Sequence, residues 1–236
     1  MNMKRLGNVI FYISLIIATL ITILLSSTNA WIVWISTILG IMSSKMASSG
    51  KLTMFLFDIV SYIFYISICL NANYFGELTL SLIIILINLF CLVEWSRHQK
   101  DNTVIISKLN KSEINFSLFC ASILLIIYSI TLYKFNSDFA FLNALSTISY
   151  LLGSYFCYRR SVLQFYSWIF YEIVFIALWL ISAVNGDVSN IIFLIGGISE
   201  LIYDILGICN WQRLVKMQRS GDVSVRTLTM CKKMKW

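Results

Sequence analysis

The feature that most constrains this chain is a succession of long apolar runs along almost its whole length. They occupy residues 8–28, 31–47, 53–71, 74–95, 114–133, 138–158, 161–183 and 188–211. A helix needs about 20 mostly apolar residues to cross the roughly 30 Å hydrocarbon core of a bilayer. Only helices and closed barrels satisfy every backbone polar group in lipid, and these runs are too long for barrel strands. The sequence therefore predicts an all-α, polytopic membrane protein with eight transmembrane helices.

The composition agrees with this class and excludes several kinds of site. The 236 residues are 59% hydrophobic and 12% charged, whereas a soluble domain carries about 25% charge. The six cysteines include no CxxC pair, and the single histidine, His98, lies in a charged loop. A zinc site or a Ser–His–Asp arrangement lacks the side chains it needs. We therefore expect no metal, no cofactor and no catalytic residue.

The lysines and arginines predict the orientation in the membrane. With the N-terminus in the cytoplasm, 17 of the 18 Lys and Arg residues lie inside and only Lys134 lies outside. This strong positive-inside bias predicts a multi-pass membrane protein with both termini in the cytoplasm. The net charge of +7 then reflects topology rather than nucleic-acid binding. The partner of the basic tail, residues 212–236, is expected to be the lipid bilayer.

Two stretches of the chain end in the same way. In INLFCLVEWSR (residues 87–97) and IYDILGICNWQR (202–213), an Asn or Asp precedes a Trp by seven positions, and an Arg follows the Trp by two. The endings lie 116 residues apart. Two shorter matches precede them in the same order, at offsets of 110 and 113: YFGELT (74–79) with VNGDVS (184–189), and ILG (38–40) with LLG (151–153).

These ordered matches predict a duplicated three-helix unit. The expected divisions are an N-terminal extra helix (1–30), a first repeat (31–96), a loop and linker helix (97–137), a second repeat (138–211) and the tail (212–236). A single linker helix makes both repeats run in the same direction. Secondary transporters use such parallel repeats and bind substrate at the repeat interface. The alternative is a chance coincidence, because Trp and Arg are enriched at helix ends in any membrane protein.

Polar side chains inside the apolar runs mark the candidate site. An acid at a helix centre costs roughly 2.5–3.5 kcal/mol to insert into a membrane, so acids there are functional candidates by default. At 3.6 residues per turn, aromatic and hydrogen-bonding groups share a stripe on several helices. The acids are Asp58, Glu172, Glu200 and Asp204, and the groups that accompany them include Tyr62, Asn88, Tyr150, Gln164 and Trp168.

Such stripes suit a flat polar ligand. Aromatic rings stack on Trp or Tyr, and a cationic ring gains further from cation–π contact and a nearby carboxylate. At some positions a purely structural role is equally compatible with the pattern. For Asn88 an interhelical hydrogen bond accounts for the residue as well as ligand contact does. Asp58 and Glu200 are also compatible with a place near the headgroups, and Trp95 and Trp211 with packing or interfacial anchoring.

The stretch YRRSVLQFYSWIFYEIVFIALW (158–179) resembles the signature of the PnuC nicotinamide riboside transporters. That signature has an arginine, then Glu-Gln-Trp, a second Trp, an Asn or Asp and a final Trp. Gln164 and Trp168 match it, while Phe165 stands at its first Trp and Glu172 at its Asn or Asp. The segments SGK (49–51) and YFGE (74–77) resemble the family's AKGK and LYGE, and Asp58 replaces a family glycine.

The resemblance implies facilitated diffusion, across a bacterial cell membrane, of a vitamin-like compound that a cytoplasmic kinase traps by phosphorylation. It also implies one site between the two helix triplets. With the polar stripes, it gives these expected substrate-binding residues: Gln164, Phe165, Trp168, Glu172, Asp58, Tyr62, Asn88, Tyr150 and Asp204. Nicotinamide riboside is the leading substrate. Relatives that carry deoxynucleosides, thiamine or riboflavin are alternatives.

The same residues are compatible with two other functional classes. An ion-coupled symporter would use the unpaired acids to carry protons or sodium. A membrane-embedded enzyme would need a catalytic pair such as Asp58 with Asp204, but no GxGD or HxxxH spacing accompanies them. We therefore expect a transporter rather than an enzyme. A homo-oligomer is compatible with these patterns.

Overall fold

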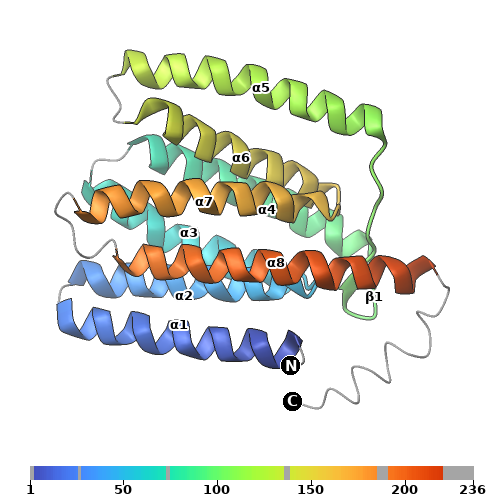
Figure 1. Ribbon diagram of the computed structural model, residues 1–236, viewed down its shortest axis with the longest axis horizontal. Helices are drawn as coiled ribbons and strands as arrows, with labels where there is room; N and C mark the ends of the chain where they lie inside the picture. The colour runs from blue at the N-terminus through green and yellow to red at the C-terminus, as the bar shows by residue number, and fades with distance from the viewer. Residues whose placement is uncertain (1–2, 26–27, 73–74, 136–138, 185–190, 220–236) are drawn as a thin grey trace.

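The computed structural model describes residues 3–25, 28–72, 75–135, 139–184 and 191–219 (Figure 1). Eight α-helices lie in these ranges, and the all-α prediction is confirmed. They are α1 (Met3–Leu25), α2 (Thr28–Ser48), α3 (Thr53–Ala72), α4 (Phe75–Arg97), α5 (Lys111–Lys134), α6 (Ala140–Tyr158), α7 (Leu163–Val184) and α8 (Ile191–Arg219). Seven of them are long and apolar enough to cross a membrane, and the described apolar part of α3 is shorter, Thr53–Ser67.

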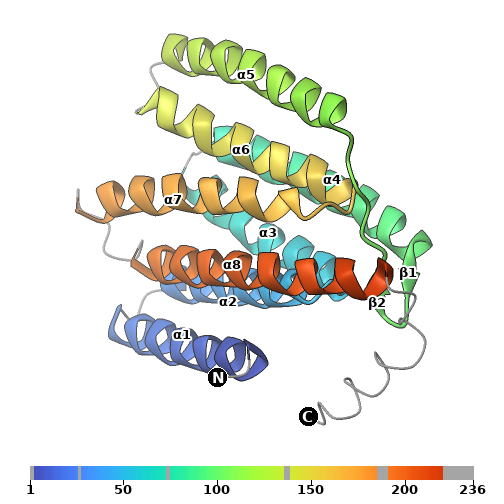
Figure 2. The same cartoon turned by 45° about the vertical axis from the view of Figure 1, so that its right-hand side comes forward.

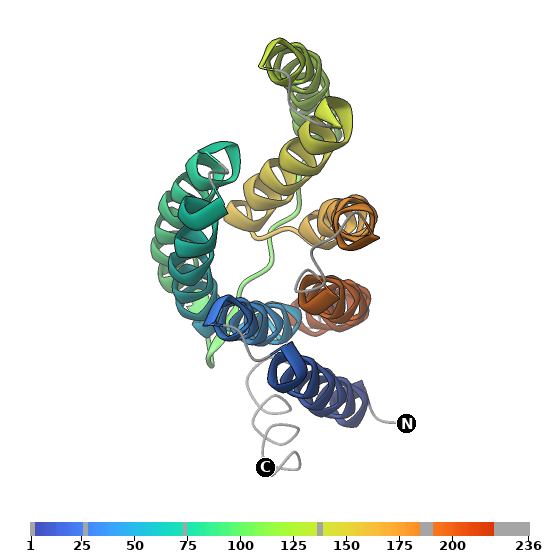
Figure 3. The same cartoon turned by 90° about the vertical axis from the view of Figure 1, so that its left-hand side faces the viewer.

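Six of the helices form a closed ring. Neighbours pack in the order α2, α3, α4, α6, α7, α8 and back to α2, and the end-on view in Figure 3 shows this arrangement. Helix α1 packs against α2 and α8, and α5 packs against α6, both outside the ring. Helix α5 has no buried residue, since most of its surface faces outward. The ring thus closes around a central space at the meeting of the two predicted triplets.

The turns that join α2 to α3 and α6 to α7 have the same backbone structure. Gly50 and Arg160, 110 positions apart, both adopt a left-handed conformation, with φ of 67° and 55°. Glycine adopts this conformation without steric cost and commonly ends helices. The same four hydrogen bonds close both turns. In the first turn these backbone bonds run from N–H to carbonyl as Gly50 to Ala47, Lys51 to Met46, Met54 to Lys51 and Phe55 to Leu52. In the second turn they run as Arg160 to Cys157, Ser161 to Phe156, Gln164 to Ser161 and Phe165 to Val162.

This shared structure fixes a register between the two triplets. At an offset of 110, Gly153 corresponds to Ser43 rather than to Gly40. The predicted match of ILG with LLG is therefore out of register by three residues. The match of residues 74–79 with 184–189 lies mostly outside the described residues. Superposition of the complete triplets stays a prediction.

The matching tryptophans at the ends of α4 and α8 make equivalent contacts. The indole N–H of Trp95 donates to the carbonyl oxygen of Cys157 at 2.8 Å, and that of Trp211 donates to the carbonyl of Ala47 at 3.0 Å. The two acceptors are themselves counterparts in the turn register. Both tryptophans are fully buried. They are core residues that join the triplets, so packing and not interfacial anchoring accounts for both.

The segment between α4 and α5 crosses the same end of the ring. It contains a two-stranded hairpin, β1 (Gln99–Lys100) and β2 (Thr103–Val104), which lies beside the end of α8 (Figure 2). Val104 N–H donates to the Gly50 carbonyl at 3.1 Å, and Ser107 N–H donates to the Arg160 carbonyl at 3.0 Å. The segment therefore bonds to both left-handed turns in succession.

Candidate functional site

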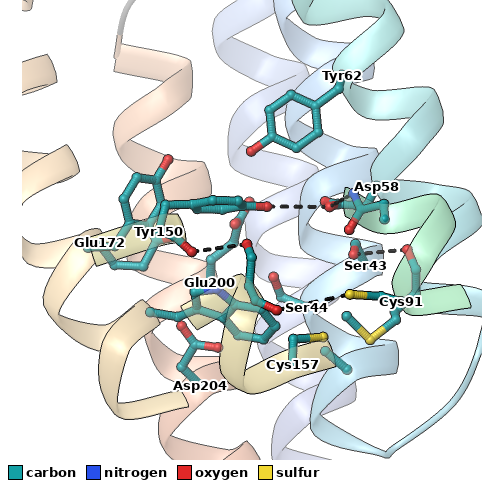
Figure 4. Close-up of a pocket in the computed structure, with 16 residues that line it drawn as sticks. Ser43, Ser44, Asp58, Tyr62, Cys91, Tyr150, Cys157, Glu172, Glu200 and Asp204 are labelled. Atoms are coloured by element: carbon teal, nitrogen blue, oxygen red, sulfur yellow. Dashed lines mark hydrogen bonds between the residues drawn. The ribbon is translucent and has the colours of Figure 1, made fainter. Parts of the chain in front are cut away.

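A cavity of about 60 Å³ lies inside the ring, and all six ring helices contribute to its walls (Figure 4). Its lining residues are Ser43, Ser44, Ala47, Met54, Asp58, Tyr62, Asn88, Cys91, Tyr150, Ser154, Cys157, Trp168, Tyr171, Glu172, Glu200 and Asp204. Four of them carry a carboxyl group and none is Lys, Arg or His. The nearby Lys45 amine instead lies 4.5 Å from the centre of the Phe11 ring.

Asp58 forms one corner of the cavity and is hydrogen-bonded. The Asn88 amide on α4 donates to Asp58 Oδ2 at 2.6 Å, and the Tyr150 hydroxyl on α6 donates to the same oxygen at 3.5 Å. Both contacts cross from one helix to another, and Figure 4 shows the one between Tyr150 and Asp58. The sequence left Asn88 open between interhelical bonding and ligand contact, and here it makes an interhelical hydrogen bond.

Three acids on α7 and α8 form a second part of the lining, and one of them, Glu200, interacts electrostatically with Asp58. Glu172 interacts electrostatically with both Glu200 and Asp204. Glu172 and Asp204 are almost completely buried, at 4% and 3% exposure. Within the described part of the chain, no basic side chain lines the cavity to neutralise them. This wall therefore concentrates negative charge or, when protonated, hydrogen-bond donors.

Glycines make room for these carboxyl groups. A Cβ atom at Gly40 would lie 2.7 Å from Glu200 Oε1, and one at Gly197 would lie 3.2 Å from Glu172 Oε2. Both separations are shorter than ordinary van der Waals contact. A larger residue at either position would therefore displace a carboxyl group in the cavity.

Aromatic rings make up much of the remaining lining. Tyr150 packs edge-on against Tyr62 and Tyr171, with ring centroids 6.3 and 5.0 Å apart. The Trp168 indole lies against Gly153, where an added Cβ would overlap the ring. The buried indole N–H of Trp168 has no hydrogen-bond partner among the described residues. The cavity therefore offers flat surfaces for stacking, and one of its aromatic residues carries a buried donor, beside Gly153, that has no partner among the described residues.

The structure brings seven of the nine predicted substrate-binding residues to the cavity. They are Asp58, Tyr62, Asn88, Tyr150, Trp168, Glu172 and Asp204. Gln164 and Phe165 are both fully buried and do not line it. Phe165 instead packs edge-on against Trp211, with centroids 5.3 Å apart. Gln164 lies one helical turn before Trp168, and its amide has no partner among the described residues.

Several lining residues were not among the predicted binding residues. Glu200 lies one helical turn before Asp204 on α8, so its spacing was a usable signal. Tyr171 is adjacent to Glu172 in sequence and still reaches the cavity. Ser43 and Ser44 occupy a helix with little polar periodicity, so no local pattern distinguishes them.

The arrangement favours binding over catalysis. Asp58 and Asp204 come from different walls, on α3 and α8, and Asp58 is bonded to Asn88. No cluster of three or more His, Cys, Asp or Glu in the described ranges is arranged to hold a metal ion. The groups present can hydrogen-bond a polar molecule, stack against a ring and attract a cation.

Comparisons with known proteins agree with this geometry. The family model described as "Nicotinamide mononucleotide transporter" matches residues 30–213. A solved structure titled "Crystal structure of the Vitamin B3 transporter PnuC" matches with a TM-score of 0.77 and 18% sequence identity, over 89% of this chain and 92% of that chain. At that identity the match shows a shared fold. No curated protein sequence matches the chain.

Proposed function

Because the chain belongs to the nicotinamide mononucleotide transporter family, we propose that it mediates facilitated uptake of a vitamin- or nucleoside-like cation. Nicotinamide riboside is the best single candidate for the substrate. One observation carries this proposal: a cavity with four carboxyl groups, a tryptophan and three tyrosines, and no basic residue in its described lining. Deoxynucleosides, thiamine and riboflavin are the alternatives within the same transport class.

The acids of the wall formed by α7 and α8 support a positively charged ligand. A pyridinium ring in the cavity would lie near Glu172 and could stack on Trp168, which lines the cavity from the same helix. Unit charges 4 Å apart interact by roughly 4 kcal/mol at an effective dielectric of 20. A cation–π contact adds about 0.5–2 kcal/mol. Ribose hydroxyls would bond to the serine and tyrosine hydroxyls that line the cavity.

The same charge distribution argues against a phosphorylated substrate. A phosphate monoester carries about two negative charges near pH 7 and is usually bound by Arg, Lys or helix N-termini. The described lining of the cavity offers four carboxyl groups and no basic side chain. We therefore favour a riboside over a mononucleotide as the transported form. Phosphorylation in the cytoplasm would then trap the product, since the charged form would not re-enter the cavity.

The size of the cavity implies that transport needs movement of the ring. A volume of about 60 Å³ accommodates only a few water molecules, since one water needs ~10–15 Å³ by this measure. A nucleoside-sized ligand requires the walls to move apart. Rocking of one helix triplet against the other is the usual motion in transporters built from repeats.

The test is uptake by purified protein in liposomes. Labelled nicotinamide riboside should accumulate to equilibrium without a proton or sodium gradient, and unlabelled nicotinamide mononucleotide should compete weakly. The exposed Asp101→Asn variant gives a matched acid-to-amide control outside the cavity. Equal competition by the mononucleotide, or no uptake of any ligand in the panel, would contradict the proposal.

A second candidate is ion-coupled symport. The three acids on α7 and α8, which have no basic partner in the described lining, favour it, because such acids carry protons or cations in many transporters. Accumulation above equilibrium that depends on an imposed proton or sodium gradient would establish this mode over passive uptake.

A further inference from the structure

The register between the triplets pairs cavity residues one by one. Phe55 packs edge-on against Trp95, with centroids 5.0 Å apart at 86°. Phe165 packs in the same way against Trp211, at 5.3 Å and 80°. The phenylalanines differ by 110 positions and the tryptophans by 116. These contacts anchor the register on α3 and α7 and on α4 and α8 at the same time.

Counting from these anchors pairs the polar residues of the cavity. Asp58 lies three positions after Phe55, and its counterpart three positions after Phe165 is Trp168. Seven positions before the tryptophans, the counterparts are Asn88 and Asp204. On α3, α4, α7 and α8 the pairs are Asp58 with Trp168, Tyr62 with Glu172 and Asn88 with Asp204, and the counterpart of Glu200 is Ile84, which does not line the cavity.

In the first triplet the polar pair is closed. Asn88 donates to Asp58 at 2.6 Å and links α4 to α3. Asn88 is 7% exposed. The acid of this half therefore already has a strong, charge-assisted partner within the protein.

In the second triplet the equivalent pair is open. The Trp168 indole N–H has no hydrogen-bond partner in the described part of the chain, although it is buried. Asp204 is 3% exposed and lines the cavity without a described hydrogen bond, and its main electrostatic interaction is with the acid Glu200. An unpaired buried polar group is costly unless a ligand or water satisfies it.

The second triplet also carries additional acids. Glu172 occupies the position of Tyr62, and Glu200 occupies the position of Ile84. All three of its acids line the cavity. The two walls therefore differ in chemistry although their backbones correspond.

We propose that the polar end of the ligand binds only to the α7–α8 wall, through Trp168, Asp204 and Glu172. The Asp58–Asn88 pair is a structural clamp between α3 and α4. The ligand class that fits has an acceptor for the indole N–H and, adjacent to it, a cationic centre or donors for the carboxyl groups. This inference rests on the proposed function only in that the cavity holds a small polar solute. It removes Asp58 and Asn88 from the direct contacts of that solute.

The first experiment needs no ligand. In purified protein, Asp58→Ala should lower the melting temperature by about 3–10 °C, because it breaks a charge-assisted hydrogen bond. Asp204→Ala should leave the melting temperature unchanged or raise it, because Asp204 faces Glu200, as Asp58 does, but has no described hydrogen bond to lose. Similar losses at both positions, or a loss only at Asp204, would overturn the inference. This result stands whatever the substrate proves to be.

The second experiment measures nicotinamide riboside binding and uptake. The swap Asp58→Asn with Asn88→Asp keeps a bonded pair and should change the apparent Kd less than about threefold. Asp204→Asn and Trp168→Phe should each weaken binding at least tenfold, the latter because it keeps a ring and removes the N–H. Loss of binding in the folded swap variant, or normal binding in both of the others, would overturn the inference. Absence of binding and uptake by the unmodified protein would instead contradict the proposed function, and the melting experiment would still decide the clamp.

Discussion

Trp95 and Trp211, the tryptophans of the two matching sequence endings, lie in contact with their ring centroids 5.5 Å apart and tilted by 54°. Each indole donates to a backbone carbonyl of the other triplet, at Cys157 and Ala47. The repeated residue therefore joins the two triplets at one end of the ring.

The tryptophan pair predicts equal effects of equivalent substitutions. Trp95→Phe and Trp211→Phe should each destabilise the protein by about 2–4 kcal/mol, since each change removes a buried hydrogen bond and leaves a void. Thermal melting in detergent measures the effect. Trp31→Phe, at a residue that is 43% exposed, is the control and should change stability little. A large loss at only one of the two tryptophans would argue against their equivalence.

The close contact between Gly153 and the Trp168 ring allows a steric test of the Trp168 position. An alanine there would overlap the Trp168 ring, so Gly153→Ala should push the indole out of place and reduce uptake at least tenfold. The control is Gly7→Ala, whose added Cβ would meet Tyr203 at an ordinary 3.5 Å. Uptake in liposomes and protein yield should be measured together. Normal uptake by a well-folded Gly153→Ala variant would remove Trp168 from the binding wall.

Substitution of Glu172 should change the specificity for cationic over neutral ligands. Glu172→Gln keeps the shape of the side chain and removes its negative charge. It should weaken binding of cationic nicotinamide riboside about tenfold or more, a loss of roughly 1.4 kcal/mol. Binding of a neutral deoxynucleoside should change less than about threefold. Inhibition constants for both ligands, with Asp101→Asn as the control, measure the difference, and equal changes for both would indicate a neutral substrate.

The side chain of Gln218 attaches the segment between α4 and α5 to the end of α8. Its side-chain oxygen accepts from Ile106 N–H and its amide donates to the Val104 carbonyl, both at 3.0 Å. Gln218→Ala should remove about 1–2 kcal/mol of local stability and speed hydrogen exchange at Ile106 roughly tenfold. The exposed Gln212 on the same helix provides the matched Gln→Ala control. Unchanged exchange in Gln218→Ala would mean that other contacts hold the segment.

The sequence by itself determined the class of protein and the helices. Hydrophobic length is a local property, and a lipid-facing helix must satisfy its own backbone, so the apolar runs alone predict the helices. The spacing of polar residues on one helix is also local. It identified Trp168 and Glu172 as residues that share a face, and both line the cavity.

Only the tertiary structure decided how those faces turn toward one another. The helical period does not report how far each helix is rotated in the ring, so Gln164 and Phe165 could not be separated from Trp168 by sequence. The same rotation brings Asn88 to Asp58 and leaves Asp204 without an equivalent bond among the described residues. The tertiary structure also showed that the match of Gly40 with Gly153 is out of register by three residues. The left-handed turns at Gly50 and Arg160 set the register of the two triplets and align Gly153 with Ser43.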